Sequence, residues 1–344
     1  MEKVCVIGAG SWGTAQAFLL AQKGQTVKMW TIENNVREEM NNEGTNKAYL
    51  PGVNIPKNIT VYADIEEAVK GATAVVMTIP SQGFREVLQK AIPFLNKNQI
   101  VINTAKGIEE SSLKRLSEVF AEETDKDLQH NFVVLSGPSH AEEVSRGIPT
   151  TVVAAGQSRE SCERVQDLYM TPRFRVYTNP DIIGVEIGGA LKNVIAICTG
   201  VSDGLGFGDN TKSALLTRGL AEISRLGVEL GANPLTFAGL AGVGDLVVTC
   251  TSMHSRNRRF GIEVGKGNSI PDALKAVRMV VEGYYTTAAA YRLKNEMNIE
   301  MPIIEQAYSV LYNGENTAES VGKLMQRGKK HELEEVVSKA YPNW

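Results

Sequence analysis

The sequence is short of the residues and motifs that mark disulfide-bonded, metal-binding and hydrolytic proteins. Its 344 residues include four cysteines and four histidines, and none of them has a spacing typical of metal ligands. The GxSxG, HExxH and P-loop motifs do not occur. We therefore expect no metal site, and we expect free, buried thiols in a reducing cytoplasm at Cys5, Cys162, Cys198 and Cys250.

Long apolar runs and a marked charge of either sign are lacking as well. No apolar run is expected to reach the length of a membrane span. The N-terminus, Met1-Glu2-Lys3, leads directly into a short apolar strand, which is not the pattern of a signal peptide. The net charge of -3 gives no reason to expect nucleic acid or an anionic membrane as a partner. These absences predict a soluble, cytoplasmic protein without membrane insertion.

The sequence does contain a glycine-rich turn near its start, Gly8-Ala9-Gly10-Ser11-Trp12-Gly13. The apolar run 4–7 predicts a buried strand before this turn, and residues 14–23 predict a helix after it. In that context Gly8 allows the tight turn, Gly10 lets a pyrophosphate approach the backbone, and Gly13 lets the helix pack on the strand. The turn therefore predicts a dinucleotide cofactor at the N-terminus of the helix.

Strand and helix patterns alternate through the first half of the chain. Apolar, β-branched segments predict strands at 4–7, 26–30, 59–62, 74–79, 99–103, 132–135, 150–155 and 174–177. Helical patterns fall between them, for example at 64–69, 84–91 and 112–123. This order predicts a doubly wound α/β sheet of the Rossmann type.

Helical patterns alone follow the Asn179-Pro180-Asp181 turn, which predicts a domain boundary. The expected helices lie at 182–199, 213–230, 234–250, 281–294, 302–312 and 317–326. We therefore expect a dinucleotide-binding domain over 1–180 and an all-α substrate and catalytic domain over 181–344, because a chain of this length exceeds one typical core.

The choice between NAD and NADP stays open. In NAD-binding folds, an acid about 20 residues past the glycines binds the ribose hydroxyls. Glu33 is the only acid close to the end of the predicted strand 26–30, but it lies late. Arg37 is the nearest guanidinium that could meet a 2′-phosphate. Neither placement decides between the two cofactors.

Two polar residues follow predicted strands directly. Lys106 comes after the strand 99–103, and Ser139 comes after the strand 132–135. Ligands of doubly wound sheets bind beyond the carboxyl ends of the strands, so both side chains are expected at the cofactor cleft. The alternative for Lys106 is a solvated surface lysine.

Lys192 is the charged residue in the later part of an apolar helical run. Burial disfavours an ammonium and lowers its pKa, as a nearby cation such as Lys106 would. A lysine with a pKa near neutrality can exchange a proton with a carbonyl or alcohol oxygen. The alternative is a lysine that extends along the apolar surface to reach water.

Asp245 and Thr249 are four residues apart, so on a helix they share one face. Asp245 could hold a lysine or accept from a substrate hydroxyl, and Thr249 could donate to an oxyanion. The alternative is a helix-capping aspartate followed by a threonine in the core.

The segment 251–260 is a basic cluster with polar donors between its arginines. Arg256 and Asn257 could bind a phosphate, because a guanidinium matches two phosphate oxygens at once. The alternative is a solvated basic turn.

Taken together, these motifs resemble the bacterial NAD(P)-dependent glycerol-3-phosphate dehydrogenase family, and the resemblance covers nearly the whole chain. It is carried by the glycine turn and by Ala105-Lys106-Gly107, Ser136-Gly137-Pro138-Ser139, Ile187-Gly188-Gly189-Ala190-Leu191-Lys192-Asn193, Gly242-Val243-Gly244-Asp245-Leu246, Ser255-Arg256-Asn257-Arg258-Arg259-Phe260-Gly261 and Val281-Glu282-Gly283-Tyr284.

The resemblance implies a reaction and its residues. Hydride transfer with NAD or NADP would interconvert sn-glycerol 3-phosphate and dihydroxyacetone phosphate, supply glycerol 3-phosphate for phospholipid synthesis, and take place in a homodimer. Lys192 matches the proton donor and acceptor, and Lys106 matches a lysine that contacts substrate and cofactor. We add Asp245 and Thr249 as catalytic candidates. The implied substrate contacts are Lys106, Gly137, Ser139, Lys192, Asn193, Asp245, Ser255, Arg256 and Asn257. The implied cofactor contacts are Gly8, Gly10, Ser11, Trp12, Gly13, Lys106, Ala141, Arg256, Val280 and Glu282.

Two positions depart from the family pattern. Ser139 stands where relatives often carry threonine, which retains the hydroxyl. Ile32 stands where many relatives carry histidine or arginine near the adenosine ribose, which removes the usual NADP contact. Two other functions fit the fold pattern: a hydroxyacid or ketopantoate dehydrogenase with a helical second domain, and a non-catalytic module that senses NAD(P)H.

Overall fold

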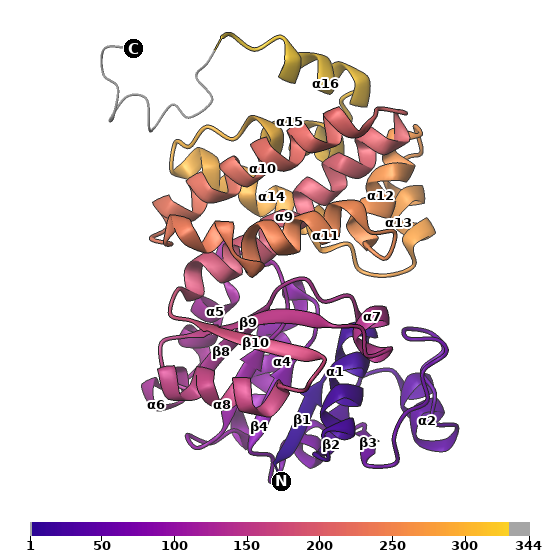
Figure 1. Cartoon of the computed structure of the whole chain (residues 1–344), viewed down its shortest axis with the longest axis vertical. Helices are drawn as coiled ribbons and strands as arrows, with labels where there is room; N and C mark the ends of the chain where they lie inside the picture. Colours follow the sequence, from indigo (N-terminus) through magenta and orange to yellow (C-terminus); the bar gives the residue numbers. More distant parts are fainter. Residues whose placement is uncertain (1, 330–344) are drawn as a thin grey trace.

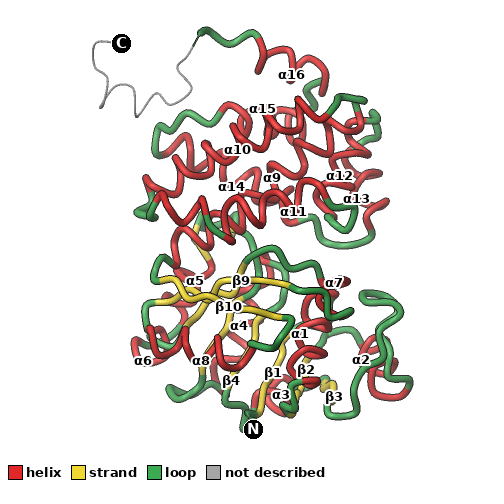
Figure 2. The backbone as a smooth tube through the Cα atoms, viewed as in Figure 1, coloured by secondary structure: helices red, strands yellow, loops and turns green. Residues whose placement is uncertain are grey.

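The protein is described by a computed structural model that covers residues 2–329. An eight-stranded sheet flanked by helices lies at one end, and a layer made of helices and loops lies at the other (Figures 1 and 2). The strands follow the order β10-β9-β8-β5-β4-β1-β2-β3 across the sheet. Their bounds are β1 Lys3–Ile7, β2 Thr26–Trp30, β3 Ile59–Tyr62, β4 Ala74–Met77, β5 Ile100–Asn103, β8 Phe132–Ser136, β9 Thr150–Gly156 and β10 Phe174–Asn179.

The predicted doubly wound sheet is confirmed, with one reversal. Neighbouring strands run parallel from β3 to β8, but β8 and β9 pair antiparallel, with Val133 opposite Gly156. β10 is parallel to β9, so the last two strands run against the other six. The first six strands therefore point their carboxyl ends at one edge of the sheet, where ligands of such folds bind.

Side chains of the central strands alternate between two cores. Val4 and Val6 of β1 belong to a core beneath the helices α1 (Ser11–Gln22) and α8 (Arg159–Tyr169). Cys5 and Ile7 belong to the opposite core, which the helices α3, α4 and α5 cover. This alternation with a period of two is what a strand buried on both faces requires. The covering helices are α3 Ile65–Val69, α4 Phe84–Ala91 and α5 Leu116–Glu123.

The helical layer is built around α9, Ile182–Gly204, which begins at its cap Asp181. Helices α10, α11, α12 and α14 pack around it (Figure 1). The expectation that no apolar run reaches the length of a membrane span is wrong for α9, which is long and apolar enough by composition. However, 83% of its most apolar window is buried inside the protein, as in the core helix of a globular fold. The bounds are α10 Asp209–Glu229, α11 Asp245–Thr251, α12 Arg256–Gly265, α13 Ile270–Val277, α14 Glu282–Glu296, α15 Pro302–Asn313 and α16 Thr317–Met325.

Helices α9 and α12 touch backbone to backbone. A Cβ atom on Gly200 of α9 would lie 2.1 Å from the carbonyl oxygen of Arg258, and one on Gly261 of α12 would lie 2.1 Å from that of Ile197. Glycine at these positions lets the two helices approach closely. The contact packs α12 against the part of α9 that follows Lys192.

Some predicted elements differ from the structure. Residues 112–115 are not the start of a helix, because they close a small hairpin of β6 (Ile108–Glu109) and β7 (Lys114–Arg115) before α5 begins. Helices α12 and α13 were not predicted. Among the cysteines, Cys198 is half-buried, while the other three are buried, and all four are free. Within residues 181–329 every regular element is a helix, as expected.

Candidate active site

The glycine turn has the geometry that a dinucleotide needs. Gly8 has φ +113°, and its N–H donates to the carbonyl of Trp30 at 2.9 Å, so β1 turns sharply beside the end of β2. Gly10 caps α1, and a Cβ atom placed on it would meet no other atom within 4 Å. The open space thus lies at a helix N-terminus, where free N–H groups and the helix dipole favour an anion. Ser11 and Trp12 form the first turn of α1.

A valine at Gly10 should weaken cofactor binding sharply without unfolding the chain. The φ of Gly10 is −67°, which valine adopts, and its side chain would occupy the open space over the helix N-terminus. We expect the NADH affinity, measured by calorimetry, to fall at least about tenfold, a loss of roughly 1.4 kcal/mol. Gly322→Val in α16 is the matched control, since a Cβ there also meets nothing within 4 Å. Unchanged NADH binding by Gly10→Val would contradict this assignment.

A substitution at Gly13 should differ from Gly10→Val, because it should lower the stability of the fold together with cofactor binding. A Cβ atom there would lie 2.1 Å from the carbonyl oxygen of Gly8, so even alanine forces the helix away from the strand. Gly13→Ala should therefore lower the stability of the fold as well as cofactor binding. Circular dichroism separates the two kinds of loss.

The residues predicted at the strand ends meet at the carboxyl edge of the sheet. Lys106 follows β5, and its Nζ donates to the carbonyl oxygen of Gly137 at 3.1 Å and to Oδ2 of Asp245 at 2.6 Å. Ser139 donates its hydroxyl to the same Gly137 carbonyl at 2.9 Å. Lys106 is therefore not a solvated surface lysine: it links the sheet to the helical layer.

Lys192 and Asp245 form a buried ion pair between α9 and α11. Lys192 is 5% exposed, and its Nζ donates to Oδ1 of Asp245 and, at 2.8 Å, to Oγ1 of Thr249. The ammonium points inward, so the alternative of a lysine that reaches water is wrong. Asp245 is the first residue of α11 and Gly244 is the cap, so Asp245 binds both lysines instead of capping the helix.

Thr249 orients Lys192 in this cluster. Its hydroxyl donates to the backbone carbonyl of Asp245 at 2.6 Å, and its oxygen accepts from Lys192. The expectation that Thr249 donates to an oxyanion is not met, because the hydroxyl has one proton and that proton is already used. Thr249 is thus a positioning residue.

Burial sets the protonation of the cluster. Burial lowers the pKa of Lys192 to about 7; the Asp245 carboxylate opposes this shift, and the Lys106 ammonium adds to it. Burial alone would raise the pKa of Asp245, but the two lysines beside it lower that pKa below its ordinary value. The result is a carboxylate that stays ionised next to a lysine that can lose its proton near neutral pH.

The basic cluster begins a helix and is not a solvated turn. Ser255 caps α12 by accepting from the N–H of Arg258, which leaves the Ser255 hydroxyl proton for another partner. Arg258 binds Asp203, whereas the guanidinium of Arg256 makes no hydrogen bond or ion pair with any residue of 2–329. Arg256 is half-buried, and burial lowers its pKa. Half-buried and unpaired, it is suited to bind an anion.

Asn257 is held by one side-chain and one backbone hydrogen bond. Its Nδ2 donates to Oδ1 of Asn193 at 2.9 Å, and its Oδ1 accepts from the N–H of Gly283 at 2.9 Å. One N–H of Asn257 and the amide group of Asn193 are left for a ligand. The hydrogen bonds of Asn257 therefore connect α12 to α9 and to the start of α14.

The implied cofactor contacts outside the turn lie on three other segments. Ala141, the first residue of the helix α7 (Ala141–Ser145), packs with Ala15 and near Trp12. Val280 is exposed before α14. Glu282 begins α14, and its carboxylate accepts from the N–H of Ser81 at 2.9 Å and from the Ser81 hydroxyl.

Sequence reasoning missed two residues at this edge. Ser81, just after the strand β4, joins the sheet to α14 through Glu282, although Pro80-Ser81 is a visible strand-end signal. His140 lies near Lys192, and its Nε2 is buried without a hydrogen-bond partner among the described residues. No pattern around His140 in the sequence indicates this placement.

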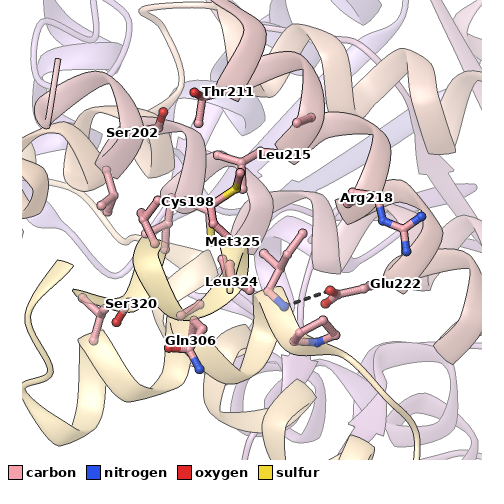
Figure 3. Close-up of a pocket in the computed structure, with 18 of the residues that line it drawn as sticks. Cys198, Ser202, Thr211, Leu215, Arg218, Glu222, Gln306, Ser320, Leu324 and Met325 are labelled. Atoms are coloured by element: carbon pink, nitrogen blue, oxygen red, sulfur yellow. Dashed lines mark hydrogen bonds between the residues drawn. The ribbon is translucent and has the colours of Figure 1, made fainter. Parts of the chain in front are cut away.

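One cavity among the described residues lies away from these side chains. It measures about 260 Å³ and lies among α9, α10, α15 and α16, where Cys198, Glu222 and Gln306 line it (Figure 3). None of the predicted site residues lines this cavity. Within residues 2–329, no group of three or more histidine, cysteine or acidic side chains could hold a metal ion.

Two family profiles match the chain in succession. The profile for the N-terminus of NAD-dependent glycerol-3-phosphate dehydrogenase matches residues 3–162, and the profile for its C-terminus matches residues 181–322. Glycerol-3-phosphate dehydrogenase [NAD(P)+] of Pelotomaculum thermopropionicum is 59% identical over 97% of this chain and 96% of its own. The enzyme of that name from Bacillus subtilis is 51% identical over 98% of each chain.

Solved structures agree with these matches. Glycerol-3-phosphate dehydrogenase from Coxiella burnetii superposes with a TM-score of 0.91 at 39% identity, over 95% of this chain and 99% of that one. A ketopantoate reductase from Ralstonia eutropha reaches a TM-score of 0.59 at 14% identity over 93% and 99%, a likeness of fold alone. With its glycine turn, its buried lysine–aspartate pair and these matches, the chain belongs to the NAD-dependent glycerol-3-phosphate dehydrogenase family.

Proposed function

We propose that this protein is an oxidoreductase that interconverts sn-glycerol 3-phosphate and dihydroxyacetone phosphate with NAD(P)(H), and so supplies glycerol 3-phosphate for phospholipid synthesis. One observation carries the proposal. Lys192 is buried beside an ionised aspartate, and a hydrogen bond between Asn193 and Asn257 joins its helix to the start of α12, where Arg256 is unpaired. A carbonyl to protonate and a phosphate to bind are the two groups that such a site fits.

The glycine turn and the start of α1 fit a dinucleotide, and Ala141, Val280, Glu282 and Arg256 lie on the segments that would complete its site. When bound, the nicotinamide supplies the hydride for the carbonyl carbon. The protein must then supply position, one proton and charge stabilisation.

Lys192 gives that proton to the carbonyl oxygen in reduction and takes one from the hydroxyl in oxidation. Its pKa of about 7 lets both forms exist near neutral pH. Asp245 fixes the ammonium by an ion pair and Thr249 by a hydrogen bond. Lys106 adds a positive charge at the same carboxylate, which favours a substrate oxygen as negative charge develops on it.

The phosphate would bind at the start of α12. Arg256 offers a planar guanidinium, while the Ser255 hydroxyl and the Asn257 amide offer neutral donors beside it. The helix N-terminus adds free N–H groups. The Gly137 carbonyl accepts from Lys106 and from the Ser139 hydroxyl, so Gly137 and Ser139 would bound the substrate beside Lys106.

The other candidate functions fit less well. A ketopantoate or hydroxyacid dehydrogenase acts on a carboxylate, whereas the Ser255-Arg256-Asn257 cluster is better suited to a phosphate. A sensing module needs no proton donor, yet Lys192 is buried and oriented by two partners. One assay distinguishes both alternative functions from the proposed one.

The function is tested by nicotinamide absorbance with purified protein. Dihydroxyacetone phosphate should be reduced with NADH or NADPH, while ketopantoate and unphosphorylated dihydroxyacetone should react far more slowly. Reduction of ketopantoate in preference to dihydroxyacetone phosphate would overturn the proposal in favour of the first alternative. Binding of NADH without any turnover would favour the sensing module.

Three further features belong to this proposal. Residues 1–180 would form the dinucleotide-binding domain and residues 181–344 the helical domain, although Met1 and 330–344 lie outside the described residues. A boundary there is supported by the end of β10 at Asn179 and the start of α9 at Ile182. The homodimer stays a prediction from the resemblance, and the cytoplasmic location stays a prediction from the sequence.

A further inference from the structure

Glu33, the acid that follows β2, lies where it can distinguish NAD from NADP. Glu33 caps the helix α2, Asn34–Asn42, three residues after the end of β2. Because the Gly8 N–H donates to the Trp30 carbonyl, the end of β2 lies directly beside the turn. In folds of this type the end of the second strand faces the adenosine ribose.

Hydrogen bonds connect the turn to this carboxylate. Asn46 donates from Nδ2 to the carbonyl oxygen of Ala9 at 2.9 Å and to Oγ1 of Thr14 at 2.8 Å. The N–H of Tyr49 donates to Oδ1 of Asn46 at 3.2 Å, and its hydroxyl donates to Oε1 of Glu33 at 2.8 Å. Oε2 of Glu33 has no partner among the described residues and is left for a ligand.

Tyr49 keeps the carboxylate in place as a neutral donor. Burial raises the pKa of Tyr49 to about 12, and Glu33 adds to the shift. The phenol therefore stays protonated at any physiological pH. Tyr49 also packs against the core that contains α1. Glu33 is thus held in one orientation by a rigid partner.

Positive charge for a 2′-phosphate is scarce around Glu33. Three basic residues lie within 26–50. Lys28 binds the backbone carbonyls of Glu67 and Lys70, and Lys47 pairs with Glu43. Arg37, one helical turn after Glu33, lies 3.5 Å from Glu38. Ile32, the residue before Glu33, is apolar and 76% exposed.

We infer that Glu33 accepts a hydrogen bond from the 2′-hydroxyl of the adenosine ribose, and that this protein therefore prefers NAD(H) to NADP(H). The inference rests on the cofactor site of the proposed function and deepens it. A 2′-phosphate carries about −1.5 to −2 charges at neutral pH, so it would meet the fixed carboxylate with like charge. A 2′-hydroxyl meets a good acceptor instead.

Binding measurements without substrate test the inference directly. Calorimetry should give a dissociation constant for NADH at least about tenfold below that for NADPH, the ratio that 1.4 kcal/mol produces. Glu33→Gln removes the charge and keeps the size, so the ratio should fall at least threefold, mainly through tighter NADPH binding. Glu43→Gln is the matched control: the same charge is lost from an exposed site at the end of α2, and the ratio should not change.

Two nucleotide fragments separate the ribose contact from the rest of the cofactor. Adenosine 5′-monophosphate should displace NADH from the wild type more effectively than adenosine 2′,5′-bisphosphate, and Glu33→Gln should reduce this difference. Equal or tighter binding of NADPH by the wild type would overturn the inference, as would an unchanged ratio in Glu33→Gln.

The failure of this inference differs from that of the proposed function. If both cofactors bind equally and both support reduction of dihydroxyacetone phosphate, only the role of Glu33 is wrong. If NADH binds preferentially but no substrate is reduced, the proposed reaction is wrong and the preference stands. Failure of both nucleotides to bind would overturn both.

Discussion

Replacing Lys192 with methionine should lower the turnover rate by about 10²–10⁴-fold or more, the usual contribution of a general acid–base group. Methionine keeps much of the apolar stem and removes the proton. Asp245 retains Lys106 as an ion-pair partner at 2.6 Å, so the variant is not left with an unpaired buried carboxylate. We therefore expect a folded protein whose chemical step alone is slow. The rate is measured by nicotinamide absorbance with saturating dihydroxyacetone phosphate.

Two controls show whether the loss is chemical. NADH affinity should stay within about twofold of the wild type, because the glycine turn lies on another element from Lys192. Lys275→Met, the same replacement at an exposed position of α13, should leave the rate unchanged. Near-normal turnover by a folded Lys192→Met protein would refute the assignment and leave Lys106 as the proton donor.

Truncating Arg256 should produce the second large effect. If the guanidinium binds the substrate phosphate, Arg256→Ala should lose about 2–5 kcal/mol, by analogy with truncated charge pairs at interfaces. That corresponds to a fall in kcat/KM of roughly 30-fold to several thousand-fold. Because the Arg256 side chain is half-buried and water screens part of the interaction, we expect the lower part of this range.

The dependence on phosphate distinguishes this contact from general damage. Unphosphorylated dihydroxyacetone should react slowly and at nearly equal rates with the wild type and with Arg256→Ala. Arg159→Ala, at an exposed residue of α8, should change neither reaction. If Arg256→Ala slows both substrates by the same factor, the phosphate assignment is wrong.

Features that depend on neighbouring residues, such as the glycine turn and the burial of Lys192, could be predicted from the sequence. The glycine turn is a contiguous signal, and the structure confirms the turn at Gly8, the open space at Gly10 and the close packing at Gly13. The burial of Lys192 was predicted from its apolar neighbours in one helix. Such features depend on residues a few positions apart, whose spacing fixes which face they share.

The rest depends on pairs that are distant in the chain. Lys106 and Asp245 are 139 residues apart, and Ser81 and Glu282 are 201 apart. The hydrophobic periodicity of the sequence does not predict such contacts, because they depend on how the helical layer packs on the sheet. The antiparallel pairing of β8 with β9 has the same origin. The basic composition of α12 concealed that helix, which contacts α9 through close glycine packing and through Phe260 and Val264, buried with Ile197.

The role of Thr249 was misjudged for a chemical reason. Spacing placed it correctly on the face of Asp245, but spacing does not say where a hydroxyl proton goes. In the structure that proton is donated to the Asp245 carbonyl, so Thr249 holds Lys192 and does not stabilise an oxyanion. The acceptor of a hydroxyl proton depends on the positions of both partners, which helical spacing does not give.

The central claim is that Lys192 carries the reacting proton, and the pH dependence of the rate in both directions tests it most directly. Reduction needs the ammonium, so its kcat/KM should be constant below pH about 7 and fall about tenfold per pH unit above it. Oxidation needs the neutral amine, so its kcat/KM should rise towards pH about 7 and then level off. Opposite limbs that meet near pH 7 and vanish together in Lys192→Met are the predicted result, whereas profiles in which that ionisation persists in the variant would contradict the account.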